Sequence, residues 1–448
     1  MPNGRFPPKI EQMSQDDLSA KLRRLGVVKG ARELKPAPPK SAAEPPQQRP
    51  FSPPSPIPEP DDWRTADDVA PLEQLLPGSK LVETADGACL VLDHVYPLSY
   101  QHGNGRLADL LAFSPTHAIP IVGDSRLGEL DFRDFLFLDT ETTGLAGAGT
   151  LAFMVGAAFF DREAFVVRQY FLRDHGDEPA MLLLLHELLE EKRGVVSFNG
   201  RSFDIPLLDG RFLINRLRTD LPQRPHLDLL HPARRLWRAR LGSCALSALE
   251  PNLLGIERTG EDVPGWLIPS LYNHYLNSGD GRELVRVFYH NRLDMVSMVT
   301  LAAQVLRQFA HATAADHPID LLSLGKWQAD LGDVAAAEQV LRWATAGKLP
   351  LELYHKALHQ LGGLLKRNGR RDEALVYWQQ IAATSFDEVE AHIELAKHYE
   401  WHHQDIAEAL AWTNRALALV ASWRNRAQAR LVEAELHHRL ARLRSKLG

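Results

Sequence analysis

Cysteine is almost absent from this chain, because only Cys89 and Cys244 occur among its 448 residues. Two cysteines are too few for a disulfide framework or for a zinc site built from thiolates, so a reducing compartment fits. Long apolar runs are absent too, since stretches such as 151–160 have about half the length of a membrane-spanning helix. The chain does not begin with a basic segment followed by an apolar core, so no secretory signal is predicted. These absences favour a soluble cytoplasmic protein.

Charge and proline are unevenly used. The formal net charge of −6 argues against a protein that coats nucleic acid along its whole length, but it allows a local basic groove. Of the 29 prolines, 14 fall within the first 60 residues. We therefore predict a disordered, Pro-rich tail over residues 1–65, in which residues 14–26 have the spacing of a short docking or transient helix.

Two carboxylates follow a buried apolar run. Residues 135–138 predict a strand, and positions two apart in a strand point to the same face, so Asp139 and Glu141 project side by side. Such a pair repels unless it holds a proton or a cation. Oxygen ligands at a strand end suit Mg²⁺ or Mn²⁺. The alternative for this isolated pair is an ordinary turn after a strand.

The segments around this pair predict a mixed α/β sheet. Two apolar runs flank Asp86-Gly87, which predicts a β-hairpin in an N-terminal extension over residues 66–131 that extends or covers the sheet. After the carboxylates, residues 152–160 and 165–171 predict two strands. A leucine-rich helix from Pro179 and a strand at 195–198 follow.

Two later segments carry further acidic residues. Residues 197–204 run from a strand through a glycine turn into a helix and deliver Asp204. Residues 288–294 lie in a helix predicted to continue to about Gln308. His290 and Asp294 are four residues apart there and share one helical face.

The order Asp-x-Glu, Asn-x3-Phe-Asp and His-x3-Asp resembles the four-carboxylate (DEDD, DnaQ-like) 3′→5′ exonucleases of the ribonuclease H-like superfamily. The stretches SFNGRSFDIPLL and HNRLDMVSM are most similar to the YprB-like branch. The resemblance implies a ribonuclease H-like mixed sheet with flanking helices over residues 132–310. It also implies two divalent metal ions, Mg²⁺ or Mn²⁺, which clamp both oxygens of a phosphoryl displacement. The metal ligands would be Asp139, Glu141, Asp204 and Asp294.

The base that assists the attacking water is interpreted as His290. In the resembling families the tyrosine type has three residues before the last Asp and the histidine type has four. This chain has His290 at the tyrosine spacing and Tyr289 at the histidine spacing. His290 is preferred because it shares a helical face with Asp294, and imidazole is suited to accept a proton at neutral pH.

Other polar residues have two interpretations each. Thr142, Thr143 and Gly144 are candidates to bind the terminal nucleotide through backbone N–H groups, with Asn199 nearby; the alternative is that they shape their loops. Eight arginines between residues 211 and 240 could contact a phosphate backbone or form internal ion pairs. His226 with Asp228 suggests a metal site or a structural pair, and Trp237 and Trp266 suggest base stacking or core packing.

The last part of the chain, residues 316–448, predicts an all-α helical-repeat domain. Gly332 with Ala337, Gly369 with Ala374 and a third pair at 404 and 409 recur at offsets of 37 and 35 residues, between helical stretches. This period resembles tetratricopeptide helix pairs, which stack and usually bind a protein partner. Here the array could instead only buttress the catalytic domain.

The sequence thus predicts a metal-dependent 3′→5′ exonuclease that acts on the single-stranded or frayed 3′ end of a nucleic acid, with a possible protein partner and no membrane. The competing hypothesis is a catalytically silent adaptor that binds nucleic acid and recruits a protein through its repeats. A third is an enzyme of the same fold that cuts internally or acts on RNA in a hybrid.

Overall fold

The computed structural model describes residues 69–144, 149–385 and 388–447. The predicted Pro-rich tail over 1–65, with its short helix, lies outside the described residues. Within these ranges, none of the helices combines the length and the apolar character needed to cross a lipid bilayer.

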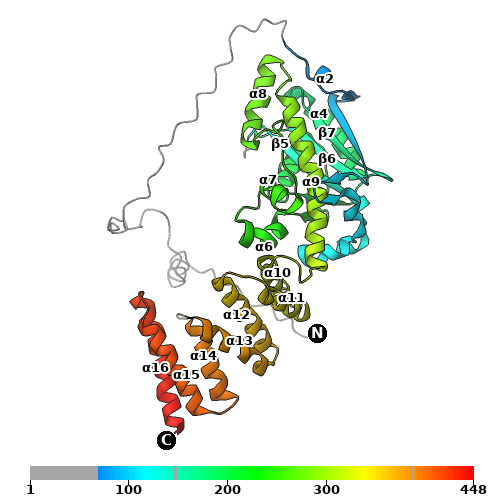
Figure 1. Ribbon diagram of the computed structural model, residues 1–448. Helices are drawn as coiled ribbons and strands as arrows, with labels where there is room; N and C mark the ends of the chain where they lie inside the picture. Colours follow the sequence, from blue (N-terminus) through cyan, green and yellow to red (C-terminus); the bar gives the residue numbers. More distant parts are fainter. Residues whose placement is uncertain (1–68, 145–148, 386–387, 448) are drawn as a thin grey trace, which may run out of the picture. The chain divides into compact units, whose positions relative to one another are not determined.

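A mixed sheet of seven strands organises the first part of the described chain (Figure 1). Its strand order is β1-β2-β7-β6-β5-β8-β9. Strands β8 and β9 run parallel to β5, and the other neighbours are antiparallel. The mixed sheet predicted from the sequence is therefore confirmed. The strands are β1 (Lys80–Thr84), β2 (Gly87–Pro97), β5 (Phe135–Thr142), β6 (Ala152–Phe160), β7 (Ala164–Phe171), β8 (Gly194–Ser197) and β9 (His226–Asp228), and a separate small ribbon holds β3 (Gln101–His102) and β4 (Gly105–Arg106).

The hairpin predicted at Asp86-Gly87 is present. Thr84 pairs with Gly87 at its closed end, and Gly87 has a φ of 127°, which only glycine adopts without strain. Strand β2 then pairs along β7 from Leu90 to Pro97. The β1–β2 hairpin therefore lengthens the sheet at one edge.

Helices cover both faces of the sheet and create two hydrophobic cores. One core joins Leu136 and Leu138 of β5 to α4 and α5, and the other joins Phe135 and Phe137 to α6. Helix α9 contributes to both cores and runs beside β5, β6 and β7 (Figure 1). The helices are α2 (Leu72–Leu75), α3 (Ile119–Val122), α4 (Glu178–Glu190), α5 (Asp204–Ile214), α6 (Leu230–Leu241), α7 (Leu246–Leu249), α8 (Ile268–Ser278) and α9 (Leu284–Ala310).

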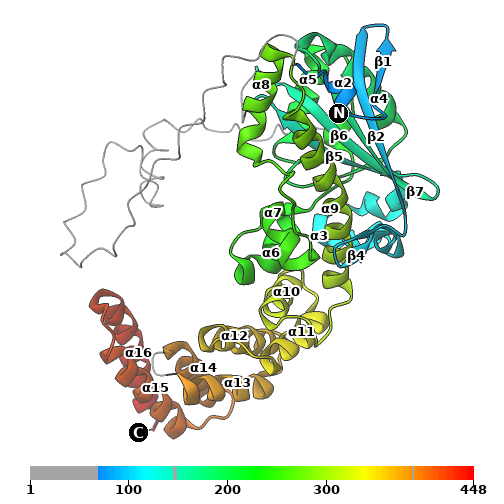
Figure 2. The ribbon, with the colours of Figure 1, turned by 45° about the horizontal axis from the view of Figure 1, so that its top comes forward.

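Three consecutive helix pairs and a final single helix make up the last part of the described chain (Figure 2). The residue in the tight turn within each pair has a left-handed backbone: Gly332 (φ 86°), Gly369 (φ 79°) and Gln404 (φ 56°). These are the recurring positions of the sequence, and the small residue five positions later is fully buried each time. The helices are α10 (Pro318–Asp330), α11 (Val334–Ala346), α12 (Leu351–Arg367), α13 (Arg371–Thr384), α14 (Val389–Trp401), α15 (Ile406–Ala421) and α16 (Arg426–Leu447).

The helical region contacts the sheet region through α6 and α10. Arg240 of α6 forms an ion pair with the buried Asp320 of α10, with Nη2 and Oδ2 2.8 Å apart. Beside it, the guanidinium of Arg235 lies 5.1 Å from the ring centre of Trp327, and that ring packs edge-on against Phe309. The same hydrophobic core continues from the sheet into α10–α14.

Candidate active site

Strand β5 carries the first two carboxylates. Asp139 and Glu141 are half-buried and alternate with the buried Thr140 and Thr142, which point to the opposite face. The strand is central in the sheet, with β6 on one side and β8 on the other. Its backbone is thus held from both sides, which fixes the direction of both carboxylates.

The third carboxylate, Asp204, is the first residue of α5 and lies next to β5. The turn between β8 and α5 has Asn199 in a left-handed conformation (φ 69°). Asp228 of β9 accepts hydrogen bonds from the backbone N–H groups of Asn199 (2.8 Å) and Arg201 (3.0 Å) and so holds this turn. Asp204 is only 4% exposed and accepts a hydrogen bond from the Thr140 hydroxyl.

The pair His226 and Asp228 is therefore structural. His226 Nε2 lies 2.7 Å from the hydroxyl of Ser197, and Asp228 also accepts from the backbone N–H of Leu230 at 3.0 Å. Every one of these contacts shapes the β8–α5 turn or the start of the next helix. Asn199 enters the same network through its own backbone N–H.

Helix α9 brings a side chain that was not singled out in the sequence, Asn291. Its Nδ2 donates to Asp139 Oδ2 at 2.9 Å, and its Oδ1 accepts from Nε2 of Gln169 at 3.0 Å. The same Gln169 donates to the Phe288 carbonyl at 2.9 Å. Opposite Asp139 on β6 stands Gly156, where a Cβ would overlap the Asn291 amide. The absence of a side chain at this position lets α9 approach the strand.

The fourth carboxylate, Asp294, is held by Arg258. This guanidinium contacts three carboxylates: Asp294, Asp262 (3.3 Å) and the fully buried Glu250 (2.5 and 2.8 Å). Burial disfavours the charge of Arg258, but its hydrogen bonds and the nearby carboxylates raise its pKa. Arg258 therefore stays protonated and supplies a positive charge beside Asp294.

His290 lies between Asp262 and Asp294. Its Nδ1 is 2.8 Å from Oδ1 of Asp262, and its Nε2 is 3.6 Å from Oδ2 of Asp294. Nη1 of Arg258 also lies 3.2 Å from Nδ1, so Nδ1 faces both Asp262 and Arg258 while Nε2 is directed towards Asp294. Tyr289 faces another way and lines a cavity of about 380 Å³ together with His94 and Arg286. His290 and Tyr289, the two candidates for the general base, therefore face different surroundings.

The four carboxylates, hereafter the carboxylate cluster (Asp139, Glu141, Asp204 and Asp294), act on one another electrostatically. Burial, then the charges of Asp204 and Asp294, raise the pKa of Asp139 well above its usual range. Burial, then the charges of Asp139 and Asp294, do the same for Glu141. Burial raises the pKa of Asp204 to about 6, although its hydrogen bond from Thr140 opposes the shift. The cluster is therefore short of positive charge.

The carboxylate cluster fits hard divalent cations. All its donors are carboxylate oxygens, and within the described ranges Asp139, Glu141 and Asp204 form no ion pair with a basic side chain. No three of these carboxylates bring ligand atoms within 4.8 Å of one another in the part of the chain that the structure describes. Asp204 is bound by Thr140, whose side chain points to the face of β5 opposite Asp139, and Asp294 is bound by Arg258.

The loop after β5 has internal hydrogen bonds. The Thr142 hydroxyl donates to the Gly144 carbonyl at 2.7 Å. The backbone N–H of Thr143 donates to the Leu151 carbonyl at 3.0 Å, and the Thr143 hydroxyl accepts from the N–H of Leu151 at 3.1 Å. These contacts give both threonines a loop-shaping role next to the cluster.

The arginines between 211 and 240 divide into two groups. Arg211 pairs with the buried Glu178, Arg224 pairs with Asp220, and Arg240 and Arg235 hold α10. The other four are Arg216, Arg218, Arg234 and Arg238. Four of the eight arginines therefore form contacts within the protein. Trp237 is fully buried in the core, whereas Trp266 is 80% exposed.

The fold and the carboxylates from β5, α5 and α9 together define an RNase H-like domain, a class that indicates a nuclease-type activity on nucleic acid. A family model described as the RNase_H superfamily matches residues 136–306. The chain is 32% identical over 330 residues to the "Uncharacterized protein YprB" of Bacillus subtilis (strain 168). The matched region covers 70% of this chain and 77% of that protein. The chain therefore belongs to the YprB family.

Proposed function

We propose that this protein is a metal-dependent 3′→5′ exonuclease that hydrolyses phosphodiester bonds at the 3′ end of a single-stranded or frayed nucleic acid in the cytoplasm. The observation that carries the proposal is the carboxylate cluster, in which burial and like charges raise the pKa of Asp139 and Glu141. Such an arrangement is unfavourable without a bound cation. Membership of the RNase_H superfamily supports a phosphodiester as the bond that is cut.

Asp139, Glu141, Asp204 and Asp294 would hold two divalent ions, Mg²⁺ or Mn²⁺. When bound, such ions lower the pKa of a water molecule and stabilise the departing 3′-oxygen. Asn291 fixes the orientation of the Asp139 carboxylate through its 2.9 Å hydrogen bond. Arg258 must leave Asp294 or share it when the ligand set closes, because its guanidinium contacts that carboxylate.

His290 would accept the proton of the attacking water at Nε2, while its Nδ1–H donates to Asp262. The contact between Asp262 and Nδ1 (2.8 Å) supports this role because it fixes the ring orientation, and Nη1 of Arg258 lies 3.2 Å from the same nitrogen. Thr142, Thr143, Gly144 and Asn199 would line the place of the terminal nucleotide mainly by keeping the adjoining loops in shape.

In this proposal residues 132–310 form the exonuclease domain, and residues 316–448 form tetratricopeptide-like repeats that recruit a protein partner or guide the substrate. The support is the recurrence of a left-handed residue in the turn of each helix pair. The extension over 66–131 has a structural role, because its hairpin lengthens the sheet.

The test is degradation of a 5′-labelled single strand with Mg²⁺ or Mn²⁺. Wild type is compared with Asp139→Asn and with the matched control Asp93→Asn, which alters an exposed carboxylate of the same sheet paired with Arg168. We expect stepwise shortening by wild type and control, and a loss of about 10³-fold for Asp139→Asn, equivalent to about 4 kcal/mol of transition-state stabilisation. Abrupt internal fragments would indicate endonuclease action. Binding without cleavage by all three proteins would support the adaptor.

A further inference from the structure

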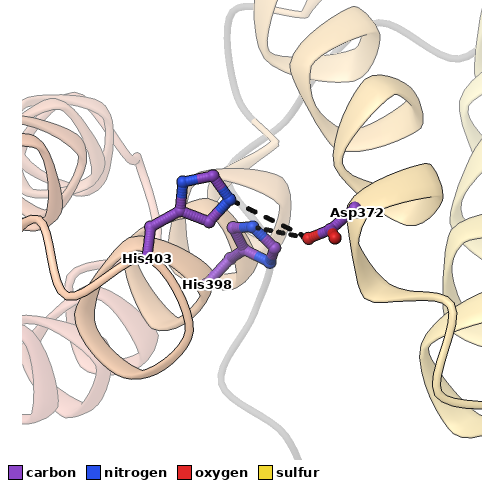
Figure 3. A group of neighbouring side chains, drawn as sticks. All are labelled: Asp372, His398 and His403. Carbon is purple, nitrogen blue, oxygen red and sulfur yellow. Dashed lines mark ion pairs between the residues drawn. The ribbon is translucent and has the colours of Figure 1, made fainter.

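We propose that Asp372, His398 and His403, hereafter the histidine cluster, form a binding site for a divalent transition-metal ion of the zinc class, which joins the second helix pair to the third. Asp372 lies in the first turn of α13, His398 in the last turn of α14, and His403 in the turn between α14 and α15 (Figure 3). Among the described residues this is the group of three whose ligand atoms lie within 4.8 Å of one another.

The distances in the cluster are close to those around a tetrahedral ion. Nε2 of His398 is 3.5 Å from Oδ1 of Asp372, and Nε2 of His403 is 3.8 Å from the same oxygen. Bonds of about 2.0–2.2 Å to a tetrahedral Zn²⁺ separate its ligand atoms by about 3.3–3.6 Å. Both distances to Asp372 lie close to this range, and all three ligand atoms lie within 4.8 Å of one another. Both imidazoles point towards the same carboxylate (Figure 3).

His398 gives the strongest indication that this cluster binds an ion. Its side chain is only 2% exposed, and neither ring nitrogen has a hydrogen-bond partner in the described part of the chain. A buried polar group without a partner costs about 1–3 kcal/mol. An apolar residue would fill the same space without that cost. A metal ion at Nε2 gives this buried imidazole a partner.

The backbone holds the two histidines in place. The N–H of His403 donates to the His398 carbonyl at 3.2 Å, and the N–H of Asp405 donates to the Tyr399 carbonyl at 2.9 Å. Gln404, between His403 and Asp405, has a left-handed backbone. These bonds close the end of α14 and bring the ring centres of His398 and His403 to 4.7 Å. The placement of His403 is thus set by the helix end, although its side chain is half exposed.

The donors predict which ions are preferred. Two imidazole nitrogens and one carboxylate suit Zn²⁺, Co²⁺ or Ni²⁺ better than Mg²⁺ or Ca²⁺, which prefer all-oxygen sites. The fourth position is open to water or to His402, whose ring centre lies 5.7 Å from that of His398. Of the nearby cations, Lys366 and Lys397 are paired with Glu394, and Arg371 is close enough to His398 to disfavour a further positive charge there.

The experiment titrates Zn²⁺ by calorimetry into the metal-stripped full-length chain, in millimolar Mg²⁺ so that the all-oxygen carboxylate cluster is saturated. We expect one Zn²⁺ per chain for wild type, and affinity at least about tenfold weaker for His403→Ala, because an outer partner of a metal ligand alone contributes about tenfold or more. His403 is the main variant because its exposed side chain is dispensable for folding. The matched control His437→Ala removes an exposed histidine of α16 and should bind like wild type.

Two further measurements keep the proposal falsifiable. Co²⁺ should give the visible absorption of a tetrahedral site in wild type, His437→Ala and Asp139→Asn, but not in His403→Ala or His398→Ala, with folding of the last checked by circular dichroism. Retention of the signal in Asp139→Asn separates this site from the proposed nuclease centre. Equal Zn²⁺ affinity of wild type and His403→Ala, or no Zn²⁺ binding by wild type, would overturn the assignment.

Discussion

The carboxylate cluster and the histidine cluster satisfy their polar groups in opposite ways. In the carboxylate cluster, Thr140, Asn291 and Arg258 already contact three of the four acidic side chains. In the histidine cluster, neither ring nitrogen of the buried His398 has a hydrogen-bond partner among the described residues. The first cluster therefore needs charge compensation, and the second needs a ligand for a neutral ring. This difference predicts hard ions that bind weakly at the sheet and a softer ion that binds tightly between the helix pairs.

Loss of His290, the imidazole that does have a fixed partner, should have a larger effect than the changes that follow. His290→Ala should lower kcat for oligonucleotide cleavage about 10²-fold, because a positioned general base contributes about 10²–10⁴-fold. Tyr289→Phe, which lines the separate cavity, should change kcat less than about threefold. The measurement is single-turnover cleavage as a function of pH. The reverse ranking of the two variants would assign the proton transfer to Tyr289.

The sequence predicts those parts of the candidate active site in which two side chains lie on the same strand or the same helix. Asp139 and Glu141 follow a strand, and His290 and Asp294 share one helical face, so period and spacing alone bring each pair together. Arg258 could not be found in this way, because it lies in a segment without helix or strand and reaches Asp294 across 36 residues. Asn291 is adjacent to His290 in sequence, but a single amide in a helix does not indicate by itself that it is buried against Asp139.

The fold shows the same limit. The hairpin and β5 to β8 follow from alternation and turn residues, whereas the three-residue β9 is too short to have a period. The histidine cluster depends on which helix pairs become neighbours. Asp372 and His398 are on different pairs, and only packing brings them to 3.5 Å. No spacing in one sequence encodes that contact.

The second prediction tests whether the carboxylate cluster is unfavourable without a cation. Burial raises the pKa of Asp204 to about 6 from an ordinary 3.8, so the folded chain binds this proton more tightly than the unfolded chain. Its contribution to stability is therefore most favourable below pH 4 and is lost as the pH rises to about 6. Metal-free Asp204→Asn should be more stable than wild type at pH 7, on the order of 2–3 kcal/mol, with no difference at pH 4.

Urea unfolding in a chelator between pH 4 and pH 7 measures this difference. The control Asp93→Asn, which alters an exposed ion pair, should shift stability by about 1 kcal/mol or less at every pH. Millimolar Mg²⁺ should stabilise wild type at pH 7 more than Asp204→Asn, because the cation offsets the same charge. An Asp204→Asn protein that is less stable than wild type at pH 7 would contradict a cluster short of positive charge.

The smallest expected effect concerns the packing that supports the carboxylates. Gly156→Ala should destabilise the protein by about 1–3 kcal/mol, because the new Cβ overlaps the Asn291 amide that donates to Asp139. Gly210→Ala is the matched control: Gly210 lies in α5 with no atom near a new Cβ, so alanine should stabilise by about 0.5–1 kcal/mol. Denaturant unfolding measures both signs. If Gly156→Ala were neutral in stability and in cleavage rate, Asn291 would not position Asp139, and the carboxylate cluster would depend on hydrogen bonding as little as the histidine cluster does.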